Sequence, residues 1–192
     1  ASSARARPAS ATPTPTPAPK TLVFPSDQAL GVILVRPADS ADPGAWAEFA
    51  EARGPAALSD ALEWGLKIES PQRRSGSAAS SAPLLAIEAV LALGDSGPRM
   101  LDFSPIGATD EDLRSIGRLV DLADLRLDFS SISNAGLQAL APLVRLQNLS
   151  LGSTGVDDAG MPFLSQLASL ESLNLSNTNV SDSGVALLAG LP

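Results

Sequence analysis

Two stretches near the end of the chain decide its fold: LQNLSLGSTGVDDAGM at residues 146–161 and LESLNLSNTNVSDSGV at residues 170–185. Both begin L-x-x-L-x-L and continue with a threonine, a valine and a position occupied by glycine, and they lie 24 residues apart (170 − 146). Extended towards the N-terminus, the same spacing gives units that begin at residues 98, 122, 146 and 170 without an insertion. A fixed period of this length predicts a solenoid of stacked units.

Each unit changes its hydrophobic period halfway. The L-x-L core alternates, which predicts a short strand with leucines on one side. The second half has apolar residues three apart, as at Leu137, Leu140 and Leu143, which predicts a short helix. Residues with capping side chains precede these helices and predict their starts, at Thr109, Ser133, Asp157 and Ser181. Stacking the units therefore predicts an α/β fold, with parallel strands on one side and helices on the other.

The pattern resembles the leucine-rich repeat family, and in particular a bacterial, planctomycete-like type with 24-residue, ribonuclease-inhibitor-like units. The stretch SAPLLAIEAVLALGDSGPRMLDFS (81–104) is similar to the entry into such repeats. The resemblance covers residues 83–192 and implies a helix at 84–93 that caps the first unit. The ninth position of the unit departs from the pattern of many relatives, which have asparagine there. It carries Ser130, Thr154 and Thr178, whose hydroxyls are expected to bond to the backbone.

Three further segments precede the repeats. Residues 1–20 alternate Thr-Pro and Ala-Pro, which predicts a disordered, polyproline-like linker. Residues 21–70 contain β-branched runs at 22–24 and 31–35 and an alternating run at 63–69, which predict a small β-rich module. Within this module, 45–53 fits either a short helix or a strand. Residues 71–82 are rich in serine, glycine and alanine and predict a second linker.

Composition excludes several kinds of site. The chain has no histidine, cysteine or tyrosine, so the usual zinc sites, thiol nucleophiles and Ser-His pairs cannot form. We predict no catalytic residue, no metal and no cofactor, because the acidic runs Asp157-Asp158 and Asp110-Glu111-Asp112 lie at helix starts, where they complement the helix dipole. A net charge of −8 disfavours nucleic acid, and no apolar run is long enough to span a bilayer.

The family resemblance implies a non-catalytic scaffold that binds a protein partner through the concave strand face. Positions 3, 5 and 7 of each unit point outward there, on strands about 4.8 Å apart. Three aspartates around Arg126 form either a charged binding site or a solvated ion pair, with a calcium site as a less favoured reading. Phe129 either anchors a partner or packs locally. The candidate residues are Asp102, Asp124, Arg126, Asp128, Phe129, Asn148, Ser150 and Asn174.

Two other functions stay open: a structural or surface-displayed repeat region without a specific ligand, and an accessory region of a larger enzyme. The Thr-Pro stalk favours an extracytoplasmic or secreted protein, although it does not exclude the cytoplasm. Pro192 lies one residue short of completing the fourth unit, and we expect the natural protein to continue with more repeats. If the chain ends at Pro192, its open last strand favours edge-to-edge self-association.

Overall fold

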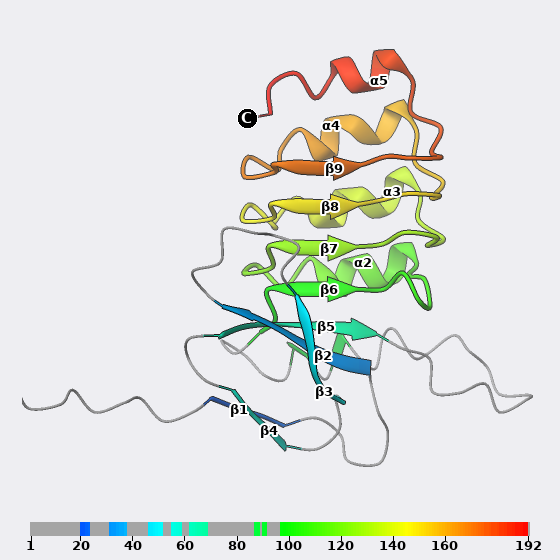
Figure 1. The fold of residues 1–192 in the computed structure, drawn as a ribbon. Coiled ribbons are helices and arrows are strands. Elements are labelled where there is room, and N and C mark those ends of the chain that lie inside the picture. Colours follow the sequence, from blue (N-terminus) through cyan, green and yellow to red (C-terminus); the bar gives the residue numbers. More distant parts are fainter. Residues whose placement is uncertain are drawn as a thin grey trace, which may run out of the picture.

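The structure is a computed structural model that describes residues 20–23, 31–37, 46–51, 55–58, 62–68, 87–88, 90–91 and 97–191. Its main feature is a seven-stranded sheet in the order β3-β2-β5-β6-β7-β8-β9, with the helices behind it (Figure 1). The predicted linker at 71–82 lies outside the described residues, as does the predicted linker at 1–20 except for Lys20, which begins a strand. Among the residues described, no helix is long and apolar enough to cross a membrane.

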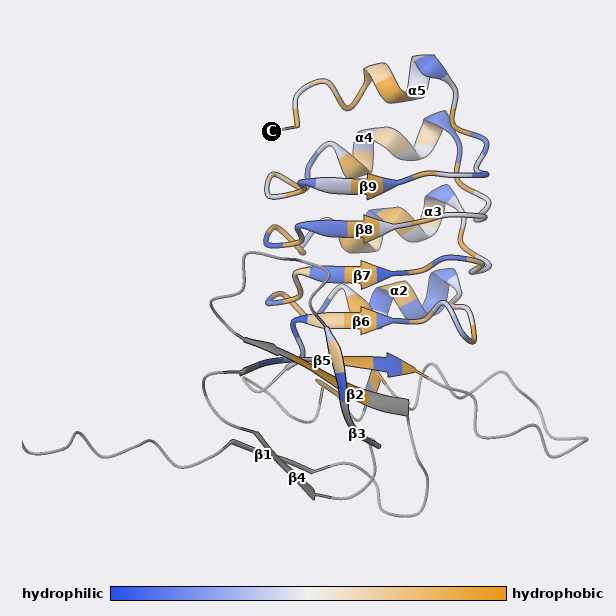
Figure 2. Ribbon diagram, viewed as in Figure 1, coloured by the Kyte–Doolittle hydropathy of each residue, from blue (hydrophilic) through white to orange (hydrophobic). Residues whose placement is uncertain are grey.

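The four repeat units supply the parallel half of this sheet. Their strands are β6 (Met100–Asp102), β7 (Asp124–Arg126), β8 (Asn148–Ser150) and β9 (Ser172–Asn174). The register of each neighbouring pair is 24 residues, so the middle leucines Leu101, Leu125, Leu149 and Leu173 form one row. In β7, β8 and β9 a hydrophobic middle residue lies between hydrophilic neighbours (Figure 2). The predicted strands are confirmed, and each contributes one apolar side chain to the core.

A helical segment returns the chain behind each strand. These are α2 (Asp110–Ile116), α3 (Asn134–Leu137), α4 (Met161–Leu164) and α5 (Asp182–Ala186), with 3₁₀ turns at Gln138–Leu140 and Asp158–Gly160. All four predicted starts are confirmed, because Thr109, Ser133, Asp157 and Ser181 each accept a hydrogen bond from a backbone nitrogen of the first turn. Thr109 and Asp112 form a reciprocal capping box.

The core is a column of aliphatic side chains between the strands and the helices. Leu125, Leu127, Leu137, Leu140 and Leu143 of the second unit are fully buried, and their equivalents in the third unit are nearly so. The serine and threonines at position 9 bond to the backbone as predicted. Ser130 Oγ accepts from the Ala108 nitrogen at 2.9 Å, and Thr154 Oγ1 donates to the Leu151 carbonyl at 2.6 Å.

Strands from the first third of the chain continue the sheet. They are β2 (Gly31–Pro37), β3 (Ala47–Glu51) and β5 (Leu62–Ile68), and β5 pairs in parallel with β6. A separate two-stranded sheet joins β1 (Lys20–Val23) to β4 (Pro55–Leu58). The segment that fitted either a helix or a strand therefore contains β3. Strands were also predicted where β1, β2 and β5 occur.

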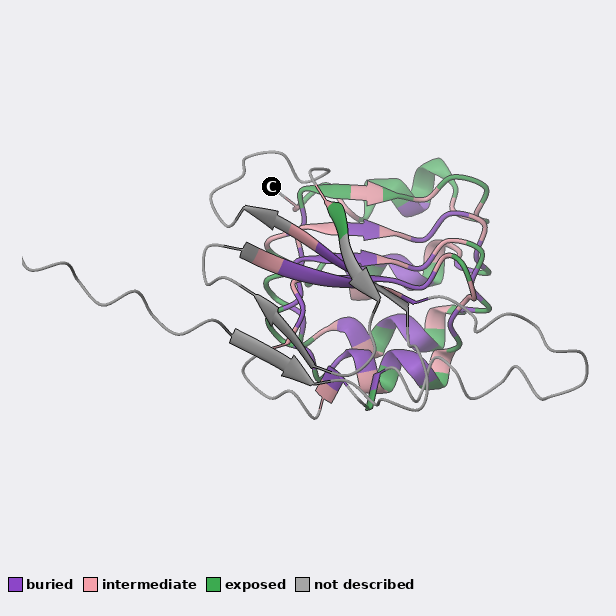
Figure 3. Cartoon of the chain, turned by 60° about the horizontal axis from the view of Figure 1, so that its bottom comes forward, coloured by how far each residue is buried: buried purple, intermediate pink, exposed green. Residues whose placement is uncertain are grey.

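Gly65 allows the two halves of the sheet to meet closely. A Cβ atom at this position would lie 2.7 Å from Met100 Cβ, and 2.9 Å from the Met100 carbonyl oxygen. The register places Leu34, Gly65 and Met100 side by side on one face. Leu34 and Met100 are buried, and β3 runs in front of β2 and β5 in two views (Figures 1 and 3). The outer face of β6 is therefore closed at Met100, although the repeat pattern predicts an open, outward position for the third residue of each unit.

The predicted capping helix at 84–93 is described only in part. Residues 87, 88, 90 and 91 have helical backbone, and Ile87 and Val90 are buried in the same core cluster as the repeat leucines. The apolar end of the first unit is thus covered by residues of this segment together with Leu66 and Ile68 of β5.

Candidate functional site

The outward face of the repeat strands opens gradually along the stack. All three residues of β6 are buried, whereas the outward residues of β8 are half-buried and those of β9 are exposed. Figure 3 shows exposure concentrated on the last unit. Asp102 and Asp124 are buried on this face, although we had predicted outward, solvated positions for them. The accessible part of the face therefore begins at Arg126 and extends towards β9.

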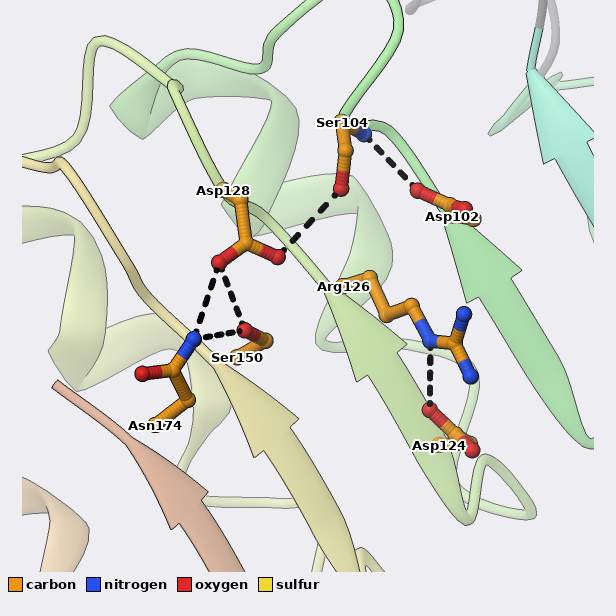
Figure 4. Close-up of polar contacts among 7 residues, drawn as sticks. All are labelled: Asp102, Ser104, Asp124, Arg126, Asp128, Ser150 and Asn174. Carbon is orange, nitrogen blue, oxygen red and sulfur yellow. Dashed lines mark hydrogen bonds and ion pairs between the residues drawn. The ribbon is translucent and has the colours of Figure 1, made fainter. Parts of the chain in front are cut away.

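Arg126 and Asp124 form an ion pair within strand β7. Arg126 Nε lies 3.6 Å from Asp124 Oδ1, and the two side chains are 41% and 5% exposed. Two residues apart on one strand, they point to the same face, which brings them together. The pair is electrically neutral, but most of its exposed side-chain surface belongs to Arg126. Figure 4 shows its guanidinium group beside the carboxylate of Asp124.

Asp128 lies at the centre of a separate hydrogen-bond network that spans all four repeat units. Its Oδ1 accepts from Ser150 Oγ at 2.6 Å, from the Gly152 nitrogen at 3.1 Å and from Asn174 Nδ2 at 3.2 Å. Its Oδ2 accepts from Ser104 Oγ in the first unit at 3.4 Å, a longer contact. Asn174 Nδ2 also donates to Ser150 Oγ at 2.9 Å (Figure 4). These bonds use most of the acceptor capacity of the carboxylate.

The predicted cluster of three aspartates around Arg126 is thus divided. Asp124 pairs with Arg126, Asp128 belongs to the hydroxyl and amide network, and Asp102 accepts a hydrogen bond from the Ser104 nitrogen at 2.9 Å. Across the ranges that the structure describes, no group of three or more acidic side chains is placed to hold a metal ion. The arrangement is suited to hydrogen bonding rather than to metal coordination.

Phe129 lies beyond the end of β7 with its ring in solvent. The side chain is 74% exposed, so the ring does not pack locally against the protein. Its φ angle is 59°, and Ser153 and Asn177 have the same left-handed backbone at the equivalent position of their units. A phenylalanine in this region is strained, because its Cβ crowds the backbone.

A shallow hollow of about 230 Å³ lies on the open face, across β7, β8 and β9. It is lined by Asp124, Arg126, Asn148, Leu149, Ser150, Ser172 and Asn174. Five of the eight residues predicted from the sequence line it, whereas Asp102, Asp128 and Phe129 do not. Its size suits one side chain of a partner rather than a drug-sized ligand.

Two polar residues of this face were not among the candidates. Ser172 occupies the third position of its unit, the same position as Asn148, so the repeat pattern itself contained the signal. Lys67 of β5 aligns with Asp102, and through it with Arg126, although it lies outside the repeats. The signal there was the alternation Leu66-Lys67-Ile68, which matches Leu-x-Leu but not the 24-residue spacing.

Comparisons with known proteins find relatives among solved structures only. No protein-family model matches the chain, and no curated protein is significantly similar to it. The structure of internalin C2 from Listeria monocytogenes is 33% identical, with a TM-score of 0.43, over 54% of this chain and 42% of that chain. An internalin (InlF) from the same organism is 21% identical, with a TM-score of 0.37, over 53% and 35%. The chain thus spans less than half the length of either structure.

The geometry of the units identifies them without help from these comparisons. Four strands pair in parallel with a constant 24-residue register, a helical return lies behind each, and L-x-L leucines fill the space between. This combination defines one repeat architecture. Residues 98–191 of this chain therefore form four stacked 24-residue repeats, the arrangement that the resemblance to leucine-rich repeats implies.

Proposed function

We propose that the chain is a non-catalytic scaffold that binds a protein partner through the open face of its leucine-rich repeats. The observation that supports this function is the hollow across β7, β8 and β9, which gathers charged, amide and hydroxyl side chains on one accessible surface. Rigid strands hold these groups, so a partner would meet a preorganised surface and few side chains would have to be ordered on binding.

The size of the face limits the strength of binding. Four strands about 4.8 Å apart present on the order of 300 Å², against about 800 Å² per partner in a stable interface. The buried outer face of β6 reduces the accessible area further. We therefore expect this region to bind weakly by itself, or as part of a larger contact that includes the exposed ring of Phe129.

A photocrosslinking amino acid introduced at chosen positions tests the proposal. Position 172 is suitable, because Ser172 lines the hollow, is exposed and forms no side-chain hydrogen bond among the described residues. Position 111 provides the control, because Glu111 is exposed on the helix side of the solenoid. In an extract of the cells that produce the protein, we expect a discrete crosslinked partner from position 172 and none from position 111.

Equal crosslinking from both positions, or crosslinking only from position 111, would contradict binding through the strand face. If neither position gives a crosslink, the structural role without a specific ligand would be favoured. A bacterial origin and a surface or secreted location are part of the same proposal, supported by the repeat pattern and by the Thr-Pro stretch of residues 12–17. Edge-to-edge self-association through β9 stays a prediction, which sedimentation at increasing concentration would test.

A further inference from the structure

The polar groups around the hollow fall into two sets, according to whether they already have partners. Asn174 donates to Asp128 and Ser150, and its Oδ1 accepts from the Ser176 nitrogen at 3.0 Å. Ser150 donates to Asp128. These side chains are occupied within the molecule, so they shape the hollow but have little left to offer a ligand.

The second set has no hydrogen bond within the part of the chain that the structure describes. It consists of the two terminal nitrogens of Arg126, the side-chain amide of Asn148 and the hydroxyl of Ser172, and all three residues line the hollow. Asn148 and Ser172 are neighbours in the register of β8 and β9, and Asn148 neighbours Asp124, the partner of Arg126. Arg126 can only donate, whereas the amide and the hydroxyl can both donate and accept.

The accessible charge of the hollow is positive, although the protein as a whole carries a net charge of −8. The side chain of Arg126 is 41% exposed, whereas that of Asp124 is 5% exposed. Asp128 lies outside the lining and accepts four hydrogen bonds. A cationic ligand would therefore meet no free carboxylate here, while an anionic ligand would meet the open edge of a guanidinium group.

We infer that this hollow receives a carboxylate side chain, an aspartate or glutamate of an extended partner segment. The carboxylate would accept two bonds from the terminal nitrogens of Arg126, the geometry that guanidinium and carboxylate groups share. Asn148 on the adjacent strand β8 donates to it, and Ser172 on β9, two strands from Arg126, bonds to the neighbouring backbone of the partner segment. The rest of the partner is neutral or basic, because the net charge of this protein repels an acidic chain. This inference rests on the proposed function and specifies the partner's chemistry.

Short random peptides, coupled to a surface through their C-termini, test the inference with the full chain in solution. Coupling removes the terminal carboxylate, so any acidic preference must come from side chains. We expect the bound peptides to be enriched in aspartate or glutamate at one position. In a soluble, amidated peptide of that sequence, Glu→Gln at this position should weaken binding about tenfold or more, the usual effect of a charge-assisted bond.

Variants of the protein assign the effect to Arg126. In Arg126→Gln the glutamate and glutamine peptides should bind equally. In Arg145→Gln the preference should persist, because Arg145 does not line the hollow. Its guanidinium group pairs instead with Asp121, at 2.6 Å. If Arg126→Gln unfolds, the double variant Asn148→Ala/Ser172→Ala retains the Arg126–Asp124 pair and should still reduce the preference for glutamate.

The outcomes separate this inference from the proposed function. Peptides that bind without an acidic preference, or a preference that persists in Arg126→Gln, would overturn the carboxylate site and leave partner binding intact. If a soluble peptide binds only when its C-terminus is free, the group in the hollow is the terminal carboxylate and not an acidic side chain. That result would overturn the inference. A failure to bind any peptide would count against both proposals.

Discussion

Asp158 holds Ser181 of the following repeat unit by two hydrogen bonds, 2.7 Å from Oδ1 to the backbone nitrogen and 2.6 Å from Oδ2 to the hydroxyl. Asp110 holds Ser133 in the same way one unit apart, at 2.8 and 2.6 Å. In both cases the serine is also the N-cap of its own helix. The residue that starts each of these helices is therefore positioned by a carboxylate of the unit before it.

The pair between these two, Asn134 with Asp157, has its carboxylate on the later unit instead of the earlier one. Asn134 Nδ2 donates to Asp157 Oδ1 at 2.7 Å, and the Asp157 nitrogen donates to Asn134 Oδ1 at 3.1 Å. The rule across the three pairs is that a carboxylate meets a serine, whereas an amide meets a carboxylate. Two carboxylates are never placed against each other, because their repulsion would oppose stacking of the units.

A glycine three residues after the second member of each of these pairs is required by the same contacts. A Cβ on Gly160 would lie 2.6 Å from Asn134 Oδ1 and 2.8 Å from Leu137 Cδ1. We expect Gly160→Ala to destabilise the fold by about 1–3 kcal/mol through overpacking. Gly190→Ala is the matched control, because nothing lies within 4 Å of its added Cβ. Urea unfolding of both variants checks this, and equal midpoints would contradict it.

Moving the carboxylate of the Asn134–Asp157 pair from residue 157 to residue 134 tests the pairing rule. Asn134→Asp alone places a second carboxylate against Asp157 and should destabilise the protein. Adding Asp157→Ser recreates the arrangement of Asp158 with Ser181, and serine also serves as an N-cap. A double-mutant cycle should therefore show favourable coupling of about 0.5–3 kcal/mol. Additive effects would show that the two side chains do not interact.

Acid should weaken the contact between Asp158 and Ser181. The hydroxyl and then the backbone N–H of Ser181 hold the pKa of Asp158 below its ordinary value of 3.8, against a smaller opposing effect of burial. Because the folded-state pKa is the lower one, the stabilisation is complete well above 3.8 and is lost as pH falls through the folded-state pKa. Carboxyl NMR titration should show a pKa below 3.8, and Ser181→Ala should raise it. An unchanged pKa in Ser181→Ala would exclude this cause.

Phe129 combines a strained backbone with a ring that gains little from burial. Its φ of 59° is shared by Asn177 at the same position of a later unit, and asparagine tolerates this conformation well. We expect Phe129→Asn to stabilise the fold by about 1 kcal/mol, the scale of left-handed strain. If the ring contacts the partner, the same variant should bind less tightly. Thermal unfolding measures the first effect, and a lower melting temperature would contradict it.

Local sequence patterns were sufficient to predict the repeats and most of their internal structure. The L-x-L strands, the helix starts at Thr109, Ser133, Asp157 and Ser181, and the hydroxyls at position 9 all depend on contacts within a unit or between adjacent identical units. A period of 24 residues displays such contacts directly in the sequence. The same period placed Asn148, Ser150 and Asn174 on one face, where the hollow now includes them.

Tertiary structure alone decided which parts of that face are open and which groups are free. Leu66 pairs with Leu101 across 35 residues (101 − 66), a spacing outside the period, so the continuation of the sheet through β5 could not be read from the repeats. The division of the charged cluster was hidden for the same reason, since Asp128 bonds to Asn174 two units away. Periodicity determines which side of a strand a residue occupies, but burial and hydrogen bonding depend on what lies opposite, and that comes from chain distant in sequence.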